Sequence, residues 1–109
     1  MKLEIGMYVR TKNGKIDKII GFDRALILFL YDLVYGYIDE NDIIKASHKI
    51  IDILEVGDYV NGYYVEDVLK TFVNVAVGSN YFQSPTIYEK DIKSIVTKEM
   101  FESMKYEVK

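Results

Sequence analysis

The chain has 109 residues, half of them hydrophobic and 28% charged, with one histidine, one proline and no cysteine. Its length suits one ordinary domain or two very small ones, and its composition is that of a folded globular protein, which argues against disorder. The lack of cysteine excludes a disulfide scaffold, a thiolate zinc site and a cysteine nucleophile, and the longest apolar run, residues 25–31, is far too short to span a bilayer.

The net charge of −3 is distributed unevenly along the chain. Residues 1–24 contain six basic and three acidic side chains, whereas residues 25–69 contain two basic and nine acidic ones. Such an asymmetry can steer a partner of opposite charge. Because no charged and then apolar leader opens the chain, we expect a cytoplasmic protein without membrane association.

The first half of the chain is typical of five short strands. Residues 7–11 lead to Asn13-Gly14, a strong hairpin signal because both residues tolerate positive φ. The predicted strands that follow are residues 15–22, 25–31, 35–38 and 43–45, with a polar turn at residues 39–42. Short strands with tight turns and no room for crossover helices favour a small antiparallel barrel.

The second half repeats this plan after a predicted helix at residues 48–54, for which Ser47 is a candidate N-cap. Asn61-Gly62 is a second hairpin signal, and Pro85 restricts one predicted strand to an edge or a loop. Thr97 can cap a helix at residues 98–104. The remaining predicted strands are residues 56–60, 63–69, 71–77, 81–87 and 91–96, and residues 106–108 are expected to be extended.

The two halves match at three places, which predicts an internal duplication. Residues 5–9 match residues 56–60, 51 positions apart; residues 16–20 match 65–69 and residues 40–43 match 89–92, both 49 apart. We therefore expect two domains, residues 1–52 and 53–109. Val9 and Val60 should then be buried at equivalent positions, and so should Ile43 and Ile92.

The pattern shared by the halves resembles tandem SH3-like barrels: a Gly-x-Tyr-Val strand, an Asn-Gly hairpin, a middle sheet and Asp-Ile before the last strand. The resemblance implies a mainly β fold of two five-stranded antiparallel barrels, each ending in a short helix. Residues 50–62 and 92–104, about a quarter of the chain, also resemble segments of small uncharacterised phage and prophage proteins of low-GC Gram-positive bacteria. This implies an anti-defence protein, similar to an anti-CRISPR protein, in the cytoplasm of a bacterial host.

No motif in the sequence predicts catalysis. His48 is the sole histidine, the clustered carboxylates match no calcium loop, and the glycines do not form a phosphate-binding run. We therefore expect a protein that is not an enzyme and that uses no metal or other cofactor.

Tyrosines near strand ends, together with the acidic segment, favour a protein-interaction module. Tyrosine gives rigid amphipathic contact area and is enriched at interfaces. The expected partner is a host or defence protein complex. The predicted partner-binding residues are Tyr35, Tyr37, Asp39, Glu40, Asp42, Tyr63, Tyr64, Glu66 and Asp67.

Two alternatives remain open. A nucleic-acid-binding barrel would use the basic hairpin formed by Arg10, Lys12, Lys15 and Lys18 to contact phosphates. The acidic overall balance argues against it, because nonspecific affinity grows with the number of phosphates neutralised. A small-ligand-binding protein would use a tyrosine-lined cleft between the two barrels.

Overall fold

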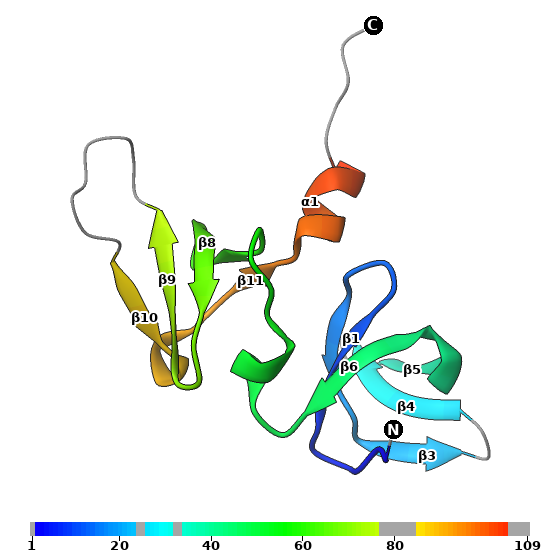
Figure 1. The fold of residues 1–109 in the computed structure, drawn as a ribbon. Helices are drawn as coiled ribbons and strands as arrows, with labels where there is room; N and C mark the ends of the chain where they lie inside the picture. The colour runs from blue at the N-terminus through cyan, green and yellow to red at the C-terminus, as the bar shows by residue number, and fades with distance from the viewer. Residues whose placement is uncertain (1, 24–25, 32–33, 77–84, 105–109) are drawn as a thin grey trace, which may run out of the picture. The chain divides into compact units, whose positions relative to one another are not determined.

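The computed structural model describes residues 2–23, 26–31, 34–76 and 85–104 (Figure 1). The chain divides into two compact units, residues 1–53 (unit 1) and residues 54–109 (unit 2). The division falls one residue after the boundary expected from the repeat. The described part is mainly β, with eleven strands, three short 3₁₀ helices and one α-helix.

Unit 1 contains two three-stranded antiparallel sheets, with strand orders β2-β1-β6 and β3-β4-β5. A 3₁₀ turn, η1, separates β5 from β6, and a second, η2, follows β6. The bounds are β1 (Tyr8–Thr11), β2 (Ile16–Lys18), β3 (Gly21–Asp23), β4 (Leu26–Tyr31), β5 (Val34–Asp39), η1 (Glu40–Asp42), β6 (Ile43–Ser47) and η2 (Ile50–Ile53).

The single return strand predicted at residues 15–22 is wrong, because the chain passes from one sheet to the other at Ile19. Ile19 is almost fully buried, its N–H donates to the Met7 carbonyl at 2.9 Å, and its own carbonyl accepts from Gly6. These contacts hold the residue between β2 and β3. Burial of one isoleucine therefore bends a segment whose sequence is typical of one strand.

The linker helix predicted at residues 48–54 is shorter than expected. Ser47 Oγ does accept a hydrogen bond, from the Lys49 N–H at 3.1 Å, but the turn that follows is the 3₁₀ helix η2. Ile51 and Ile53 of η2 are both buried. The segment thus buries two isoleucine side chains in unit 1 and ends as a 3₁₀ turn, without continuing as an α-helix.

Unit 2 contains one curled five-stranded antiparallel sheet of order β10-β9-β8-β7-β11, followed by the helix α1. Pro85 immediately precedes the edge strand β10, as expected, and α1 has the predicted bounds. None of the described helices is long and apolar enough to cross a membrane. Residues 81–84 and 106–108, predicted to be extended, lie outside the described residues. The bounds are β7 (Tyr59–Val60), β8 (Tyr63–Val68), β9 (Phe72–Ala76), β10 (Thr86–Tyr88), η3 (Glu89–Asp91), β11 (Ile95–Val96) and α1 (Lys98–Met104).

The two units share one strand order when β2 and β3 are taken together as the counterpart of β8. The backbone bonds agree: Gly6 donates to Ile19 and Ile19 to Met7, just as Gly57 donates to Val65 and Val65 to Asp58. Ile19 is therefore equivalent to Val65, and the predicted match of residues 16–20 with 65–69 is out of register. The first hairpin is shorter in unit 2, where Tyr59 pairs with Tyr64, than in unit 1, where Tyr8 pairs with Lys18, and this difference produces the shift.

The predicted core positions hold for three of four residues. Val9 and Val60 are fully buried, and Ile43 is 7% exposed, but Ile92 is only half-buried. β6 begins at Ile43 itself, whereas β11 begins only at Ile95 because the intervening Lys93 and Ser94 N–H groups donate to the Asn61 side chain. Ile92 therefore precedes the strand that would bury it.

We expect Val9→Ala, Val60→Ala and Ile43→Ala each to lower the free energy of unfolding by about 1–4 kcal/mol, through lost burial and a residual cavity. Ile92→Ala should cost clearly less than Ile43→Ala, because Ile92 is partly solvated already. Urea unfolding of each variant measures these differences. Equal losses for the two isoleucine variants would contradict the assignment.

Candidate functional site

The predicted partner-binding residues fall into two sets. Tyr37, Asp39, Glu40 and Asp42 are exposed on β5 and η1 of unit 1, and Tyr63, Tyr64, Glu66 and Asp67 are exposed on β8 of unit 2. Tyr35 belongs to β5, but its side chain lies outside the described part of the structure. Among the side chains that the structure describes, the β8 set stands beside a cluster of further aromatic residues.

A bulge in β8 explains why its two adjacent acidic residues are both exposed. The register with β9 shifts between Val65 and Asp67, and Val65 is fully buried against β9. Glu66 is the extra residue of the bulge, so Glu66 and Asp67 both remain at the surface. Tyr63 and Tyr64 are 45% and 42% exposed beside them.

Tyr59 of β7 lies at the centre of the aromatic cluster in unit 2. Its ring contacts Tyr64 edge to face, with centroids 5.7 Å apart, and stacks on Phe101 of α1 with centroids 4.9 Å apart. Tyr59 and Tyr64 are brought together by the β7–β8 register, in which they are direct partners. Phe101, in contrast, belongs to α1, near the C-terminal end of unit 2.

A buried carboxylate positions α1 for this contact. Asp58 is fully buried; its Oδ2 accepts from the Glu55 N–H at 2.7 Å and its Oδ1 accepts from the Lys98 N–H at 3.0 Å. Thr97, also buried, caps the helix by accepting from the Met100 N–H at 3.3 Å. The cap at Thr97 confirms the sequence prediction, while the role of Asp58 was not predicted.

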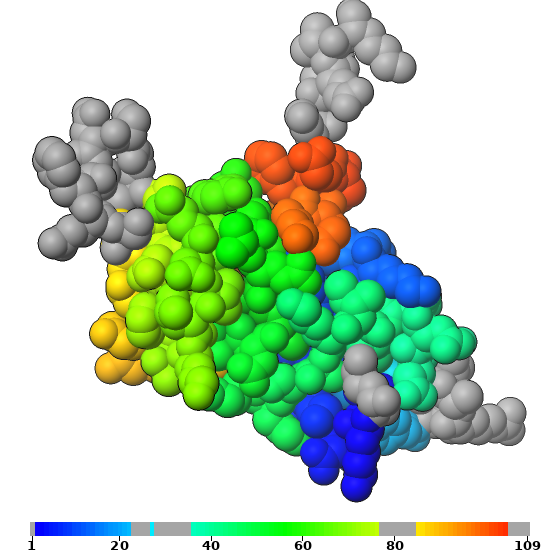
Figure 2. All heavy atoms as spheres, in the orientation of Figure 1, coloured from blue at the N-terminus to red at the C-terminus, as the bar shows by residue number. Residues whose placement is uncertain are grey.

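The Tyr59, Tyr64 and Phe101 rings line a surface pocket of about 350 Å³, which we call the aromatic groove. Val56 and Phe101 are 50% and 44% exposed in it, and Figure 2 shows α1 (orange) projecting at the surface of unit 2. The Lys98 ammonium lies 2.7 Å from the Glu55 carboxylate. The groove is lined by Val56, Gly57, Tyr59, Tyr64, Lys98, Phe101 and Glu102.

The equivalent place in unit 1 has a different chemistry. Tyr8 corresponds to Tyr59, but its register partner is Lys18, whose ammonium lies 5.4 Å from the centre of the Tyr8 ring. Glu4 there pairs with His48 at 3.1 Å. His48, the sole histidine, is thus an exposed surface residue whose ring contacts the Glu4 carboxylate. The two units, which share one strand order, thus differ here: unit 1 carries a lysine–tyrosine contact and unit 2 carries the aromatic groove.

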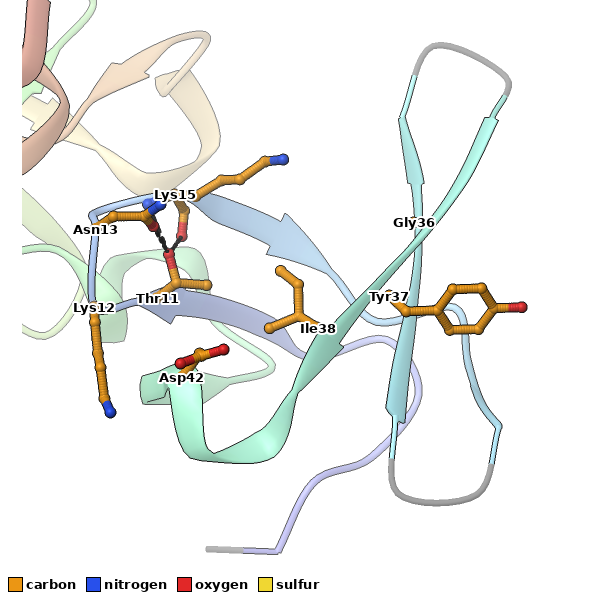
Figure 3. Close-up of a pocket in the computed structure, with 8 residues that line it drawn as sticks. All are labelled: Thr11, Lys12, Asn13, Lys15, Gly36, Tyr37, Ile38 and Asp42. Atoms are coloured by element: carbon orange, nitrogen blue, oxygen red, sulfur yellow. Dashed lines mark hydrogen bonds between the residues drawn. The ribbon is translucent and has the colours of Figure 1, made fainter.

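A second pocket, the hairpin cleft, lies within unit 1 between the β1–β2 hairpin and β5 (Figure 3). Its volume is about 480 Å³. It brings together Lys12 and Lys15, two of the three lysines of the nucleic-acid hypothesis, and two residues of the partner-binding prediction, Tyr37 and Asp42. It is lined by Thr11, Lys12, Asn13, Lys15, Gly36, Tyr37, Ile38 and Asp42.

Arg10 cannot belong to a basic surface, which corrects the nucleic-acid prediction. Its side chain is fully buried, and Nη1 donates to the Ile53 carbonyl of η2 at 3.1 Å. β1 is covered on both faces, Val9 packing into the core and Arg10 lying under η2. Lys12, Lys15 and Lys18 are exposed, so three of the four predicted basic residues remain at the surface.

Sequence reasoning missed Tyr59, Phe101, Lys98 and Glu102. The helical spacing of Met100, Phe101 and Met104 predicts an apolar face, yet Phe101 and Met104 are 44% and 64% exposed. A short helix whose apolar side chains stay largely exposed indicates a binding site. In the sequence, Tyr59 stands out only as part of the repeated Gly-x-Tyr-Val strand.

Within the described ranges, no group of three or more histidine, aspartate or glutamate side chains is arranged to hold a metal ion. No family model, curated protein or solved structure is similar enough to this chain to count as a match. The function must therefore be argued from the two pockets and the side chains that line them.

Proposed function

We propose that this protein is a non-enzymatic protein-interaction module whose principal binding surface is the aromatic groove of unit 2. The observation that carries the proposal is the contact of Tyr59, Tyr64 and Phe101 in a groove that leaves Tyr64 and Phe101 more than two-fifths exposed. Clustered aromatic rings at a protein surface usually mark a site of interaction. Aromatic side chains that become buried on binding supply most of the binding free energy at protein interfaces.

The charges around the groove favour a basic partner. Glu102 lines the groove, and Glu66 and Asp67 follow Tyr64 on β8. The one lysine in the groove, Lys98, is paired with Glu55. A partner arginine or lysine can place its cation over the Tyr64 ring while the acidic side chains compensate its charge.

The proposed scaffold is a pair of tandem SH3-like barrels. It is supported by the shared strand order, by the curled sheet of unit 2, and by the 3₁₀ turns η1 and η3 at equivalent places before the last strands. The sequence resemblance to phage and prophage proteins supports a bacterial host or defence complex as the partner. An acidic, aromatic surface would act there by occupying a basic nucleic-acid channel.

We expect Tyr64→Ala and Phe101→Ala each to weaken partner binding by roughly 30-fold or more, because hot-spot truncations cost about 2 kcal/mol and upward. The partner is first isolated by affinity capture from a bacterial host, and its affinity for each variant is then measured by surface plasmon resonance. Tyr88→Ala is the matched control, because Tyr88 is a 50% exposed tyrosine on β10 of the same unit.

The proposal fails if Tyr64→Ala and Phe101→Ala keep the wild-type affinity while folded, as judged by circular dichroism. It also fails if Tyr88→Ala weakens binding equally, since the effect would then belong to exposed tyrosines in general. Submicromolar binding to bare DNA or RNA at physiological salt, lost on reversing Lys12 and Lys15, would favour the nucleic-acid alternative instead.

A further inference from the structure

The edge strand β5 of unit 1 has one paired side. In the part of the chain that the structure describes, β5 is joined to β4 and to no other strand. Alternate residues of such a strand turn their N–H and C=O groups outward, where they form a template for another strand. β5 is six residues long and contains no lysine and no proline, the residues with which proteins usually protect an edge.

The duplicated unit provides an internal comparison. By the offset of 49 that relates η1 to η3, Gly36 of β5 corresponds to Pro85, which immediately precedes β10. β10 is three residues long, and the proline beside it has no N–H to offer. Unit 2 thus carries a protected edge where unit 1 carries a longer edge with a glycine that lets another backbone approach closely.

The hairpin cleft runs along this edge. Gly36, Tyr37 and Ile38 form one wall, and Figure 3 shows the Ile38 side chain pointing towards Thr11 while the Tyr37 ring points away from the hairpin. Tyr37 therefore presents mainly its backbone to the cleft. A pocket bounded by an edge-strand backbone and a single apolar side chain suits an extended peptide better than a compact ligand.

The opposite wall of the cleft is rigid and basic. The Thr11 hydroxyl bonds to Asn13 and accepts from the Lys15 N–H at 3.0 Å, and the Lys12 N–H donates to the Asp42 carbonyl at 2.9 Å. These bonds fix the backbone of Lys12 and Lys15 on the wall that faces β5, and Figure 3 shows their side chains extending from it in opposite directions. With two ammonium groups and one carboxylate, Asp42, the lining is net positive.

We propose that β5 binds an extended, acidic segment of a partner protein as an added antiparallel strand, with carboxylates of that segment meeting Lys12 and Lys15. The main-chain pairing supplies affinity and the lysines supply the preference for acidic sequences. This surface is chemically the reverse of the aromatic groove, which favours a basic partner, and the two can be tested separately.

The probe is a capped peptide of alternating glutamate and valine, compared with its lysine counterpart and titrated into isotopically labelled protein by NMR. We expect saturable binding of the glutamate peptide, slower exchange of the outward β5 amides, and at least about tenfold weaker binding of the lysine peptide. Two N-methylated forms of the glutamate peptide are also compared, one methylated at the odd residues and one at the even residues. One of the two should bind at least about tenfold more weakly than the unmethylated peptide, because its methyl groups replace the N–H donors that face β5.

Charge reversal on the protein gives an independent readout. Lys12→Glu with Lys15→Glu should weaken glutamate-peptide binding at least about tenfold. Lys70→Glu with Lys93→Glu, an equal charge change at exposed sites of unit 2, should leave it within about twofold. Tyr64→Ala should also leave it unchanged, which separates this proposal from the aromatic groove.

Four results would overturn the proposal. The first is no saturable binding of the glutamate peptide, and the second is equal binding of both N-methylated peptides. The third is a dimer in sedimentation experiments whose β5 amides are protected without peptide, which would make a second copy of the chain the occupant. The fourth is DNA binding that depends on Lys12 and Lys15 while the peptide does not bind there.

Discussion

Arg10→Ala is expected to destabilise unit 1 by about 3–5 kcal/mol, through a lost charge-assisted hydrogen bond and a cavity of several methylene groups. The side chain is fully buried and donates to the Ile53 carbonyl, so truncation leaves that carbonyl without this donor beneath η2. Such a loss is a large fraction of the stability of a small domain. Urea unfolding followed by NMR, with amides of each unit observed separately, measures it.

Lys12→Ala is the matched control for Arg10→Ala, because it removes a basic side chain two residues along that is exposed. It should change the free energy of unfolding by no more than about 0.5 kcal/mol. Arg10→Met, which keeps most of the volume and removes the donor, should fall between the two. If Arg10→Ala were as mild as Lys12→Ala, the buried position of Arg10 would be wrong and the basic hairpin would regain its fourth member.

Asp58→Ala is expected to destabilise unit 2 by about 2–4 kcal/mol, because hydrogen bonds to a charged acceptor contribute about 1.5–3 kcal/mol each. The Glu55 and Lys98 N–H groups would lose their acceptor. The hydrogen bonds that connect the segment before β7 to the first residue of α1 would therefore be lost. Phe101 would then no longer be held against Tyr59. Partner binding at the aromatic groove should fall together with stability, which the unfolding and binding measurements described above both report.

Asp67→Ala supplies the comparison for Asp58→Ala, since Asp67 is an exposed aspartate of the same unit. Its unfolding free energy should stay within about 0.5 kcal/mol of the wild type. Slower α1 amide exchange in Asp58→Ala than in the wild type would contradict the role assigned to Asp58. Asp58→Asn, which keeps one carbonyl acceptor, should be intermediate and should retain part of the binding.

Local sequence signals determined much of the strand plan. The Asn-Gly pairs place both first hairpins because Gly14, Asn61 and Gly62 adopt positive φ, as such turns require. Thr97 determined where α1 begins, through its own hydroxyl. Signals of this kind work because the interacting atoms are only a few residues apart, so the sequence contains both partners in one window.

Part of the candidate site could also be read from the chain. The tyrosines and carboxylates of β8 were predicted as partner-binding residues, and Tyr63, Tyr64, Glu66 and Asp67 are all exposed. They were predicted from the position of the tyrosines near strand ends and from the acidic segment. Their companions Tyr59 and Phe101 were not found, because they meet across 42 positions of sequence through the docking of α1 on β7.

Only the tertiary structure decided what covers the second face of each strand. Alternation predicts that Val9 and Arg10 point to opposite sides of β1, but not that η2 returns to bury the arginine. The same limit applies to Ile19, whose burial bends one predicted strand into β2 and β3, and to the hairpin cleft, where lysines and β5 meet. Periodicity reports the direction of a side chain from its own backbone, whereas burial and pocket formation depend on segments far away in the sequence.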